Sequence, residues 1–397
     1  MPGYVTTRGA WGVVGAFSLV GAVTQLVWLT YAPITDEAAG HYEVSTSAIG
    51  WLANIFPLWY VLLAVPVGVA LDRWLRGTVL VGALVLAAGC LVRLGDGYGW
   101  AFAGQTLTAI AQPLVVTAIT PVAARYLPEA ERPKAIALAT ASTFAGMIAA
   151  FVLATTVDLG PLLGIEAVVA LLAAGLLAVA FRAEPAAVEA PRPATALADF
   201  RAAWGSPVVR RMCLLVPVPF GTFTALTTWA EPLLSPAGVT ADQTGLMLMA
   251  NVVAGVVACA VLPVWAAAHG RRRVTLLVGV VVAVLACVAL AVRPSFPVGM
   301  VGLLAVGALL LPSLPIVLEL SERAAPLVAG SAAGLVWLAG QSGALVVTGV
   351  TGLWLDAPAA AFLLLAAITA VALPLVPRRE VLDGEPTGPG HQVVNPV

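Results

Sequence analysis

Charged residues are scarce in this chain: they make up 10% of its 397 residues, whereas hydrophobic residues make up 61%. A soluble globular domain carries about 25% charged residues, so this chain lacks the polar surface that a soluble fold of its length needs. Its basic residues are divided among short segments and form no stripe, so we expect no nucleic-acid partner. The composition indicates an integral membrane protein whose partner is the lipid bilayer.

Histidine and cysteine are scarce too, with three and four residues in the chain. His41, His269 and His391 all fall outside the middle of any apolar segment, which excludes a histidine that ligates haem or relays protons within the membrane. The cysteines are spaced neither as a disulfide framework nor as a metal cluster, and no P-loop for ATP is present. We therefore expect no metal, no cofactor and no catalytic residues, and we predict that the protein is not an enzyme.

Apolar segments of about 20 residues, the length that crosses a bilayer as a helix, recur along the chain. Because lipid does not tolerate irregular backbone exposed to hydrocarbon, each segment is predicted to be helical. We expect twelve spans, near residues 10–34, 49–71, 78–95, 100–126, 135–157, 160–181, 211–234, 244–269, 273–293, 297–320, 326–354 and 358–377.

The basic residues divide unequally between the two sides of the membrane that these spans define. All Lys and Arg residues except Arg93 and Arg293 fall on the side that also holds both termini. Since cytoplasmic loops carry the excess of bases, we predict a multi-pass protein of the cell membrane with both termini in the cytoplasm. Arg93 and Arg293 are expected to snorkel to the outer surface, and binding of an anionic substrate is the alternative.

One linker, at 182–208, differs from the short connections elsewhere because it is rich in Ala and Pro and mixed in charge. We therefore expect a six-helix bundle at 1–181 and a second one at 209–377. The polar segment 378–397, which also contains Gly and Pro, is predicted to be a disordered cytoplasmic tail.

A weak internal repeat relates the two halves. Arg93 closes the third span and Arg293 closes the ninth, while Ala145-Gly146 of the fifth span matches Ala339-Gly340 of the eleventh. Repeats of six helices are typical of transporters, whose substrate site lies at the repeat interface near the middle of the membrane.

The segment Gly68–Arg76 follows the second span and resembles a sequence signature of the major facilitator superfamily. The superfamily pattern is Gly-x-Leu-Ala-Asp-Arg-x-Gly-Arg, and this chain departs from it at Leu75 and has the Leu-Ala pair in reverse order, as Ala70-Leu71. The resemblance implies that Asp72 caps a neighbouring helix and holds the cytoplasmic gate in the outward-open state, which suits a carboxylate at a positive helix N-terminus. An Asp-Arg pair that only sets topology is the alternative. The predicted gating residues are Gly68, Asp72, Arg73 and Arg76.

A closer resemblance covers the first five spans well and the eleventh fairly. The residues that carry it are Phe17-Ser-Leu, Trp28-Leu-Thr-Tyr31-Ala-Pro-Ile34, Trp51-Leu, Pro57, Tyr60-Val, Pro66, Cys90-Leu-Val-Arg93-Leu-Gly95, Gly104-Gln105, Ala111-Gln112-Pro113, Gly330-Ser-Ala-Ala-Gly334 and Gln341. They resemble the feline leukaemia virus subgroup C receptor-related branch of the superfamily, whose members transport choline and ethanolamine. The resemblance implies an all-α membrane fold, with twelve transmembrane helices in two six-helix bundles around a central cavity.

The same resemblance implies a substrate site. Trp28 matches the tryptophan that stacks on the quaternary ammonium of the substrate, and Gln112 and Gln341 match glutamines that line the same cavity. The tyrosine that the family carries in its seventh helix has no clear counterpart, since either Phe220 or Thr227 would take its place. The fifth span also departs from the family, with Ala-Gly where an Asn-Gln pair is expected.

The residue types favour the same site without the family. Trp28 and Tyr31 are three residues apart and share one helix face, and an aromatic face attracts a cation by about 0.5–2 kcal/mol. A tryptophan of the interfacial belt is the alternative for Trp28. Gln112 and Gln341 lie in the middle of spans, where a buried amide either bonds a neighbouring helix or faces a wet cavity.

The seventh span contains Glu231, which is costly if it lies within the membrane. It could attract a cationic substrate or carry a coupling proton, and the alternative is an outer loop that begins after Trp229. The span also has several prolines, and broken helices line transporter sites. We expect its aromatic residues Phe220, Phe223 and Trp229 to close the cavity formed by Trp28, Tyr31, Gln112 and Gln341.

The sequence thus predicts a monomeric secondary or facilitative transporter that moves a small organic solute, best a choline-like amine, by alternating access. Proton-coupled efflux of drugs or metabolites through Glu231 is the alternative within this class. A non-transporting membrane receptor is the alternative of another class, and the lack of a docking domain in the loops disfavours it.

Overall fold

The computed structural model describes residues 7–182, 196–325 and 328–377, and every regular element within these ranges is a helix. The N-terminal half comprises seven α-helices. They are α1 (Thr7–Leu29), α2 (Thr35–Tyr42), α3 (Thr46–Val92), α4 (Tyr98–Val116), α5 (Ile119–Tyr126), α6 (Arg132–Thr156) and α7 (Leu159–Ala180).

The short helix α8 (Ala196–Gly205) lies in the predicted linker and leads into the C-terminal half. The helices of that half are α9 (Pro207–Leu215), α10 (Pro217–Leu234), α11 (Ala241–Ala268), α12 (Arg272–Val292), α13 (Phe296–Leu310), α14 (Ser313–Ala324), α15 (Ala329–Thr351), α16 (Pro358–Ala370) and α17 (Ala372–Leu375). The predicted tail at 378–397 lies outside the described residues.

The described helices provide eleven segments that are long and apolar enough to cross a membrane, and the bent pair α4 and α5 gives a twelfth. The long helix α3 supplies two of the spans, because its backbone leaves helical geometry at Trp74 (φ −138°, ψ 52°). The predicted all-α membrane fold is confirmed.

Prolines account for most of the breaks inside the spans. Proline has no N–H to donate and its ring clashes with the carbonyl four residues earlier, so a helix stops before it. Pro121 follows the 44° bend between α4 and α5, and Pro217 begins α10 directly after α9 ends. Pro312 and Pro315 likewise flank the start of α14.

The first span ends earlier than predicted. We expected a helix to residue 34, but α1 ends at Leu29, and a turn at residues 30–34 leads into α2. Pro33 lies in that turn, and its missing N–H ends the helical hydrogen-bond pattern. The short helix α2 that follows was not predicted.

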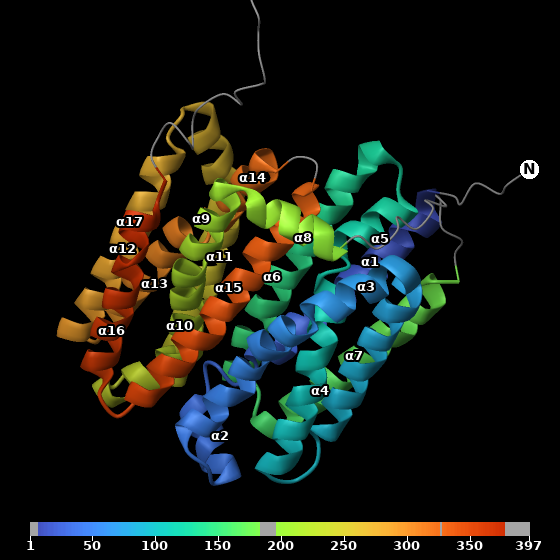
Figure 1. Ribbon diagram of the computed structural model, residues 1–397. Helices are drawn as coiled ribbons and strands as arrows, with labels where there is room; N and C mark the ends of the chain where they lie inside the picture. Colours follow the sequence, from blue (N-terminus) through green and yellow to red (C-terminus); the bar gives the residue numbers. More distant parts are fainter. Residues whose placement is uncertain (1–6, 183–195, 326–327, 378–397) are drawn as a thin grey trace, which may run out of the picture.

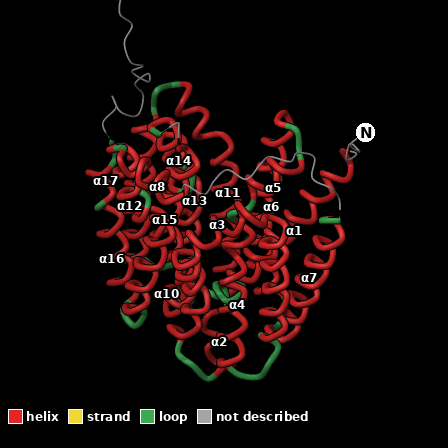
Figure 2. The backbone as a smooth tube through the Cα atoms, turned by 45° about the vertical axis from the view of Figure 1, so that its right-hand side comes forward, coloured by secondary structure: helices red, strands yellow, loops and turns green. Residues whose placement is uncertain are grey.

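The two halves lie side by side, with α2 at one end of the molecule and α8 at the other (Figures 1 and 2). We call these ends the α2 face and the α8 face. Toward the α8 face, the helices α5 and α14 of the two halves lie apart (Figures 1 and 2). Across the halves, α3 packs against α15 and α6 packs against α11.

The halves are in close contact near the α2 face. Asn54 of α3 donates a long hydrogen bond of 3.5 Å to the carbonyl of Leu345 in α15. Thr155 at the end of α6 lies directly against Gly245 near the start of α11. The polypeptide therefore closes this end of the interface between the halves.

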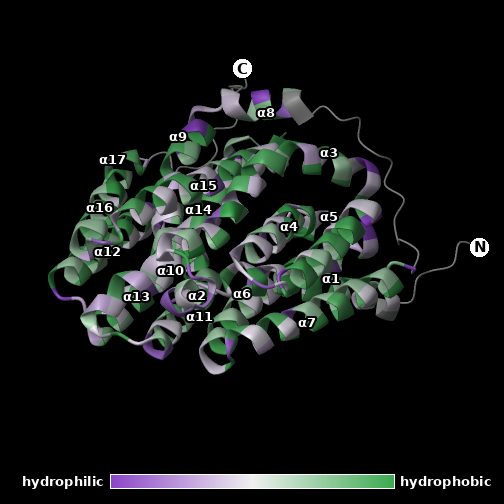
Figure 3. Ribbon diagram, turned by 90° about the horizontal axis from the view of Figure 1, so that it is seen from below, coloured by the Kyte–Doolittle hydropathy of each residue, from purple (hydrophilic) through white to green (hydrophobic). Residues whose placement is uncertain are grey.

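The outer flanks of the molecule are apolar, and hydrophobic colouring dominates the outward sides of α7, α12 and α16 (Figure 3). Leu172, Val292 and Leu363 on these three helices have 60%, 79% and 50% of their surface exposed. Such a surface suits the hydrocarbon of a bilayer, which surrounds it in a multi-pass membrane protein.

Candidate substrate site

Trp28 lies in the last turn of α1 and is held in one orientation. Its indole Nε1–H donates a hydrogen bond of 3.0 Å to the carbonyl of Ala53 in α3. Its ring is tilted against Phe56, with the ring centroids 6.1 Å apart. The half-buried indole also packs against the apolar cluster that contains residues of both halves.

Gln112 and Gln341 are nearly buried, with 5% and 8% of their surface exposed. Neither amide has a hydrogen-bond partner among the described residues, but the amide atoms are not completely shielded from solvent. Gln105 differs, because it is fully buried and its Nε2 donates a bond of 2.9 Å to the carbonyl of Val27 in α1. Gln105 thus joins two helices, whereas the other two amides keep their hydrogen-bonding capacity.

Tyr31 does not join Trp28 in an open aromatic face. Its side chain is 2% exposed, and the guanidinium of Arg93 lies 5.2 Å from the centre of its ring. Its hydroxyl lies 3.5 Å from that of Tyr42 in α2. One face of the Tyr31 ring therefore already holds a cation, and that cation belongs to the protein.

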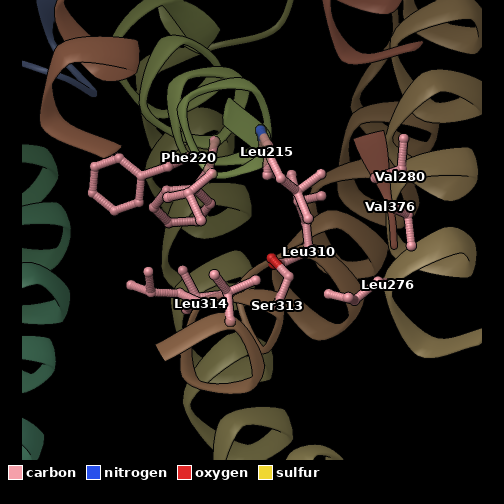
Figure 4. A pocket seen from close by; sticks show the side chains of 13 residues that line it. Leu215, Phe220, Leu276, Val280, Leu310, Ser313, Leu314 and Val376 are labelled. Atoms are coloured by element: carbon pink, nitrogen blue, oxygen red, sulfur yellow. The ribbon is translucent and has the colours of Figure 1, made fainter. Parts of the chain in front are cut away.

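Phe220 and Phe223 border a small cavity inside the C-terminal half (Figure 4). Its volume is about 20 Å³, and apart from Ser313 its lining is apolar. That volume is enough for a water molecule or two and too small for an organic amine. Phe220 also meets Trp337 of α15 edge to face, at 5.7 Å between ring centroids.

Trp229 seals the α2 face instead of lining an open cavity. Its indole Nε1–H donates to the carbonyl of Thr348 at 2.8 Å, and its ring is 1% exposed. The ring lies so close to Gly50 of the N-terminal half that a Cβ there would overlap it. The Trp229 ring thus occupies a space that exists only because residue 50 is a glycine.

Glu231 lies inside α10 and is 5% exposed, so the alternative that placed it in an outer loop is wrong. Its Oε2 accepts a hydrogen bond of 3.0 Å from the backbone N–H of Asp36 in the first turn of α2. A carboxylate at the positive end of a helix is stabilising. Glu231 therefore joins the C-terminal half to α2.

The prediction that Arg93 snorkels to the surface is wrong, whereas Arg293 is exposed as expected. Arg93 is 1% exposed, and its Nη1 lies 2.8 Å from Oε2 of Glu166 in α7. The Thr30 hydroxyl donates a bond of 2.6 Å to Oε1 of the same carboxylate. Sequence reasoning missed Glu166, although an acid inside an apolar span is a signal in itself.

The predicted gating motif is described only in part, because the side chain of Asp72 lies outside the described residues. Arg73 is exposed, and the guanidinium of Arg76 lies about 6 Å from the rings of Tyr126 and Phe181. The gating role of this motif stays a prediction. Within the described ranges, no group of three or more His, Cys, Asp and Glu side chains could hold a metal ion.

Apolar helices of membrane-spanning length, arranged in two halves that each contain a buried amide without a hydrogen-bond partner among the described residues, are typical of a multi-pass membrane protein of the transporter class. The Major Facilitator Superfamily profile matches residues 17–348, and the chain belongs to this superfamily.

Two curated relatives show the branch. Solute carrier family 49 member A3 of Danio rerio is 27% identical over 364 residues, which are 85% of this chain and 77% of the relative. Choline/ethanolamine transporter FLVCR1 of Mus musculus is 32% identical over 142 residues, which are 34% of this chain and 25% of the relative. The predicted resemblance to the feline leukaemia virus receptor-related branch is confirmed.

Solved structures agree with the fold. The D-xylose-proton symporter superposes with a TM-score of 0.71 at 14% identity, over 94% of this chain and 99% of that one. A bacterial homologue of the human lysosomal transporter Spinster, in its inward-facing and unoccupied conformation, gives 0.69 at 15% identity, over 94% and 95% of the two chains. At such low identities the likeness concerns the fold alone.

Proposed function

We propose that the protein carries a choline-like quaternary amine across the cell membrane by alternating access. The observation that supports this proposal most is the fixed, half-buried indole of Trp28 together with the unbonded amides of Gln112 and Gln341. A quaternary ammonium has no N–H to donate, so it binds through aromatic faces and oxygen dipoles. The two amides could hydrogen-bond the hydroxyl of a choline-like alcohol.

The composition of the interior and the relatives support an amine over an anion. Among the described side chains of the N-terminal half, the buried arginine is Arg93, and its charge is already paired with Glu166. A strong anion would therefore find no available cation there. The relatives named choline/ethanolamine transporters match only part of this chain, so they favour the substrate class without identifying the substrate.

The closed α2 face supports an inward-facing state. Because basic residues are in excess at the other side, we infer that the α2 face lies outside the cell. On that assignment, Trp229 and Glu231 close the extracellular end, and the site would load or release its substrate on the cytoplasmic side. Glu231 is then a closing contact, which does not favour the alternative of a proton carrier.

Uptake of labelled choline into vesicles that contain the purified protein tests the proposal. We expect Trp28→Ala to raise the KM for choline by up to about 30-fold, which corresponds to the roughly 2 kcal/mol of a desolvated cation–π contact. Trp28→Phe should retain part of the affinity. Trp204→Ala is the matched control, because Trp204 is exposed on α8 and its loss should leave KM unchanged.

The choline proposal fails if no member of a panel of quaternary amines enters these vesicles above the level of empty ones. An imposed pH gradient is the second arm of the experiment. Choline flux that follows the gradient in the native protein, and loses that dependence in Glu231→Gln, would restore the proton-coupled alternative.

A further inference from the structure

A cluster of polar side chains surrounds the last turn of α1, inside the N-terminal half. We call it the polar collar; it consists of Thr30, Tyr31, Arg93, Gln105 and Glu166. All five side chains are 2% exposed or less. They come from the turn that directly follows α1, from the C-terminal end of α3, and from α4 and α7, so the collar ties the end of α1 to three other helices.

Besides the ion pair between Arg93 and Glu166, the contacts of the collar end on the segment that carries Trp28. Gln105 donates to the carbonyl of Val27 at 2.9 Å, one residue before Trp28. Glu166 accepts from Thr30 at 2.6 Å, and Arg93 lies over the ring of Tyr31. The collar therefore brackets Trp28 on both sides along the chain.

Arg93 and Glu166 are not arranged for stability alone. The guanidinium of Arg93 lies 2.8 Å from Glu166, yet none of its three buried nitrogens makes a hydrogen bond of good geometry among the described residues. A buried ion pair with unfilled hydrogen bonds contributes little net stability, and apolar residues of similar size often replace such a pair without loss. Removing only one of the two residues is costly, however, because the charge of the other then stays buried without a partner.

The collar also reaches the helix at the α2 face. The Tyr31 hydroxyl, next to Arg93, lies 3.5 Å from the hydroxyl of Tyr42, the last residue of α2. Burial raises the pKa of Tyr42 well above its usual range, so this side chain is a neutral hydrogen-bonding partner near pH 7. The first turn of α2 receives Glu231 from the other half.

We propose that Arg93 and Glu166 are a positioning pair for transport. The pair fixes the end of α1, so that the indole of Trp28 is presented in one orientation and α2 is seated at the α2 face. Neither residue touches the substrate; both act through Thr30 and Tyr31. This inference rests on the proposed function only for its transport readout.

The double variant Arg93→Met/Glu166→Met tests the pair, because it removes both charges together and leaves none stranded. We expect its KM for choline to rise about tenfold, equal to about 1.4 kcal/mol, while the maximal rate per folded protein changes less than about twofold. A pair that served stability alone would lower the amount of folded protein and leave KM unchanged. Arg293→Met is the matched control, since Arg293 ends the equivalent helix and is exposed.

A cycle with Trp28→Phe shows whether the pair acts through Trp28. If it does, adding the double variant to Trp28→Phe raises KM much less than adding it to the native protein. Fully additive effects on KM would overturn the proposal, and so would an unchanged KM.

Hydrogen–deuterium exchange of residues 27–42 provides a readout that needs no substrate. We expect faster exchange in this segment of the double variant than in Arg293→Met or the native protein, with the remaining helices unchanged. Unchanged exchange in residues 27–42 would overturn the positioning role. If the native protein transports no amine but the exchange increases, the proposed function fails while the positioning role stands.

Discussion

Arg93 and Arg293 end the third membrane-spanning helix of their halves, but Arg93 is buried and Arg293 is exposed. The difference comes from a neighbouring helix. In the N-terminal half α7 contributes Glu166 as a partner, whereas the sequence of α16 between Pro358 and Ala370 contains no acid. The same basic position of the repeat is thus buried in one half and exposed in the other. What differs is one residue on a neighbouring helix, the acid Glu166.

The two halves share a second way of holding helices together, which involves no charge. In the N-terminal half, a Cβ on Gly146 would overlap the backbone carbonyl of Ala22, and in the C-terminal half a Cβ on Gly307 would overlap that of Asn251. Small residues allow such close backbone approach in membrane helices. The halves therefore differ in their buried charge and agree in their backbone packing.

The largest effect is expected from removing one charge of the pair formed by Arg93 and Glu166, and it tests the difference between the two halves directly. Arg93→Met leaves the Glu166 carboxylate buried and unpaired, so we expect a loss of about 3–5 kcal/mol in the free energy of unfolding. Arg293→Met, the equivalent change at an exposed position, should change it by less than about 0.5 kcal/mol. Unfolding curves of both variants in detergent measure the difference. Equal midpoints would show that the buried carboxylate of Glu166 does not need the charge of Arg93.

A smaller effect is expected from the glycines. Gly146→Ala and Gly307→Ala each force two helices apart, and we expect each to cost about 1–3 kcal/mol in the free energy of unfolding. Gly175→Ala in α7 is the control, because a Cβ there meets no atom within 4 Å, and alanine favours a helix by up to about 1 kcal/mol. A large loss in one half only, measured by the same unfolding curves, would mean that the halves also differ in packing.

The spans and the superfamily were predictable from the sequence because they depend on local properties. A run of apolar residues long enough to cross a bilayer must be helical wherever its neighbours lie. The breaks at Pro121 and Pro217 also depend on local sequence, since proline acts on its own helix, although the span at 100–126 was predicted to be unbroken. Even so, the early end of α1 at Leu29 was missed, although Pro33 could have indicated it.

The candidate site was predictable only in part, because side-chain contacts between helices are not local. Trp28 could be singled out by its residue type, but nothing along α1 indicates that Arg93 covers the ring of Tyr31. The fate of Arg93 depends on Glu166 of another span, and the contact of Glu231 depends on α2, a helix that was not predicted. The role of a polar residue in a membrane helix therefore depends on which polar residue a neighbouring helix places opposite it.

The smallest effect concerns the contact that Glu231 makes across the halves. The N-terminal half uses its buried acid, Glu166, internally, whereas Glu231 of the C-terminal half bonds the N–H of Asp36 in α2. We expect Glu231→Ala to shift the equilibrium toward an open α2 face by about 1.5 kcal/mol, the lower end for a hydrogen bond to a charged group. Glu37→Ala is the matched control, because this neighbouring acid is exposed.

The opening can be measured by labelling a cysteine at the interface between the halves. Asn54 is 2% exposed and faces α15, so in a background with Cys259→Ser, Asn54→Cys should react with a membrane-impermeant maleimide only when the α2 face opens. Labelling should then be about tenfold faster with Glu231→Ala and unchanged with Glu37→Ala. Equal rates for Asn54→Cys alone, with Glu231→Ala and with Glu37→Ala would mean that the packing of Trp229 against Gly50 is sufficient to close this end. Glu231, unlike Glu166, would then be dispensable.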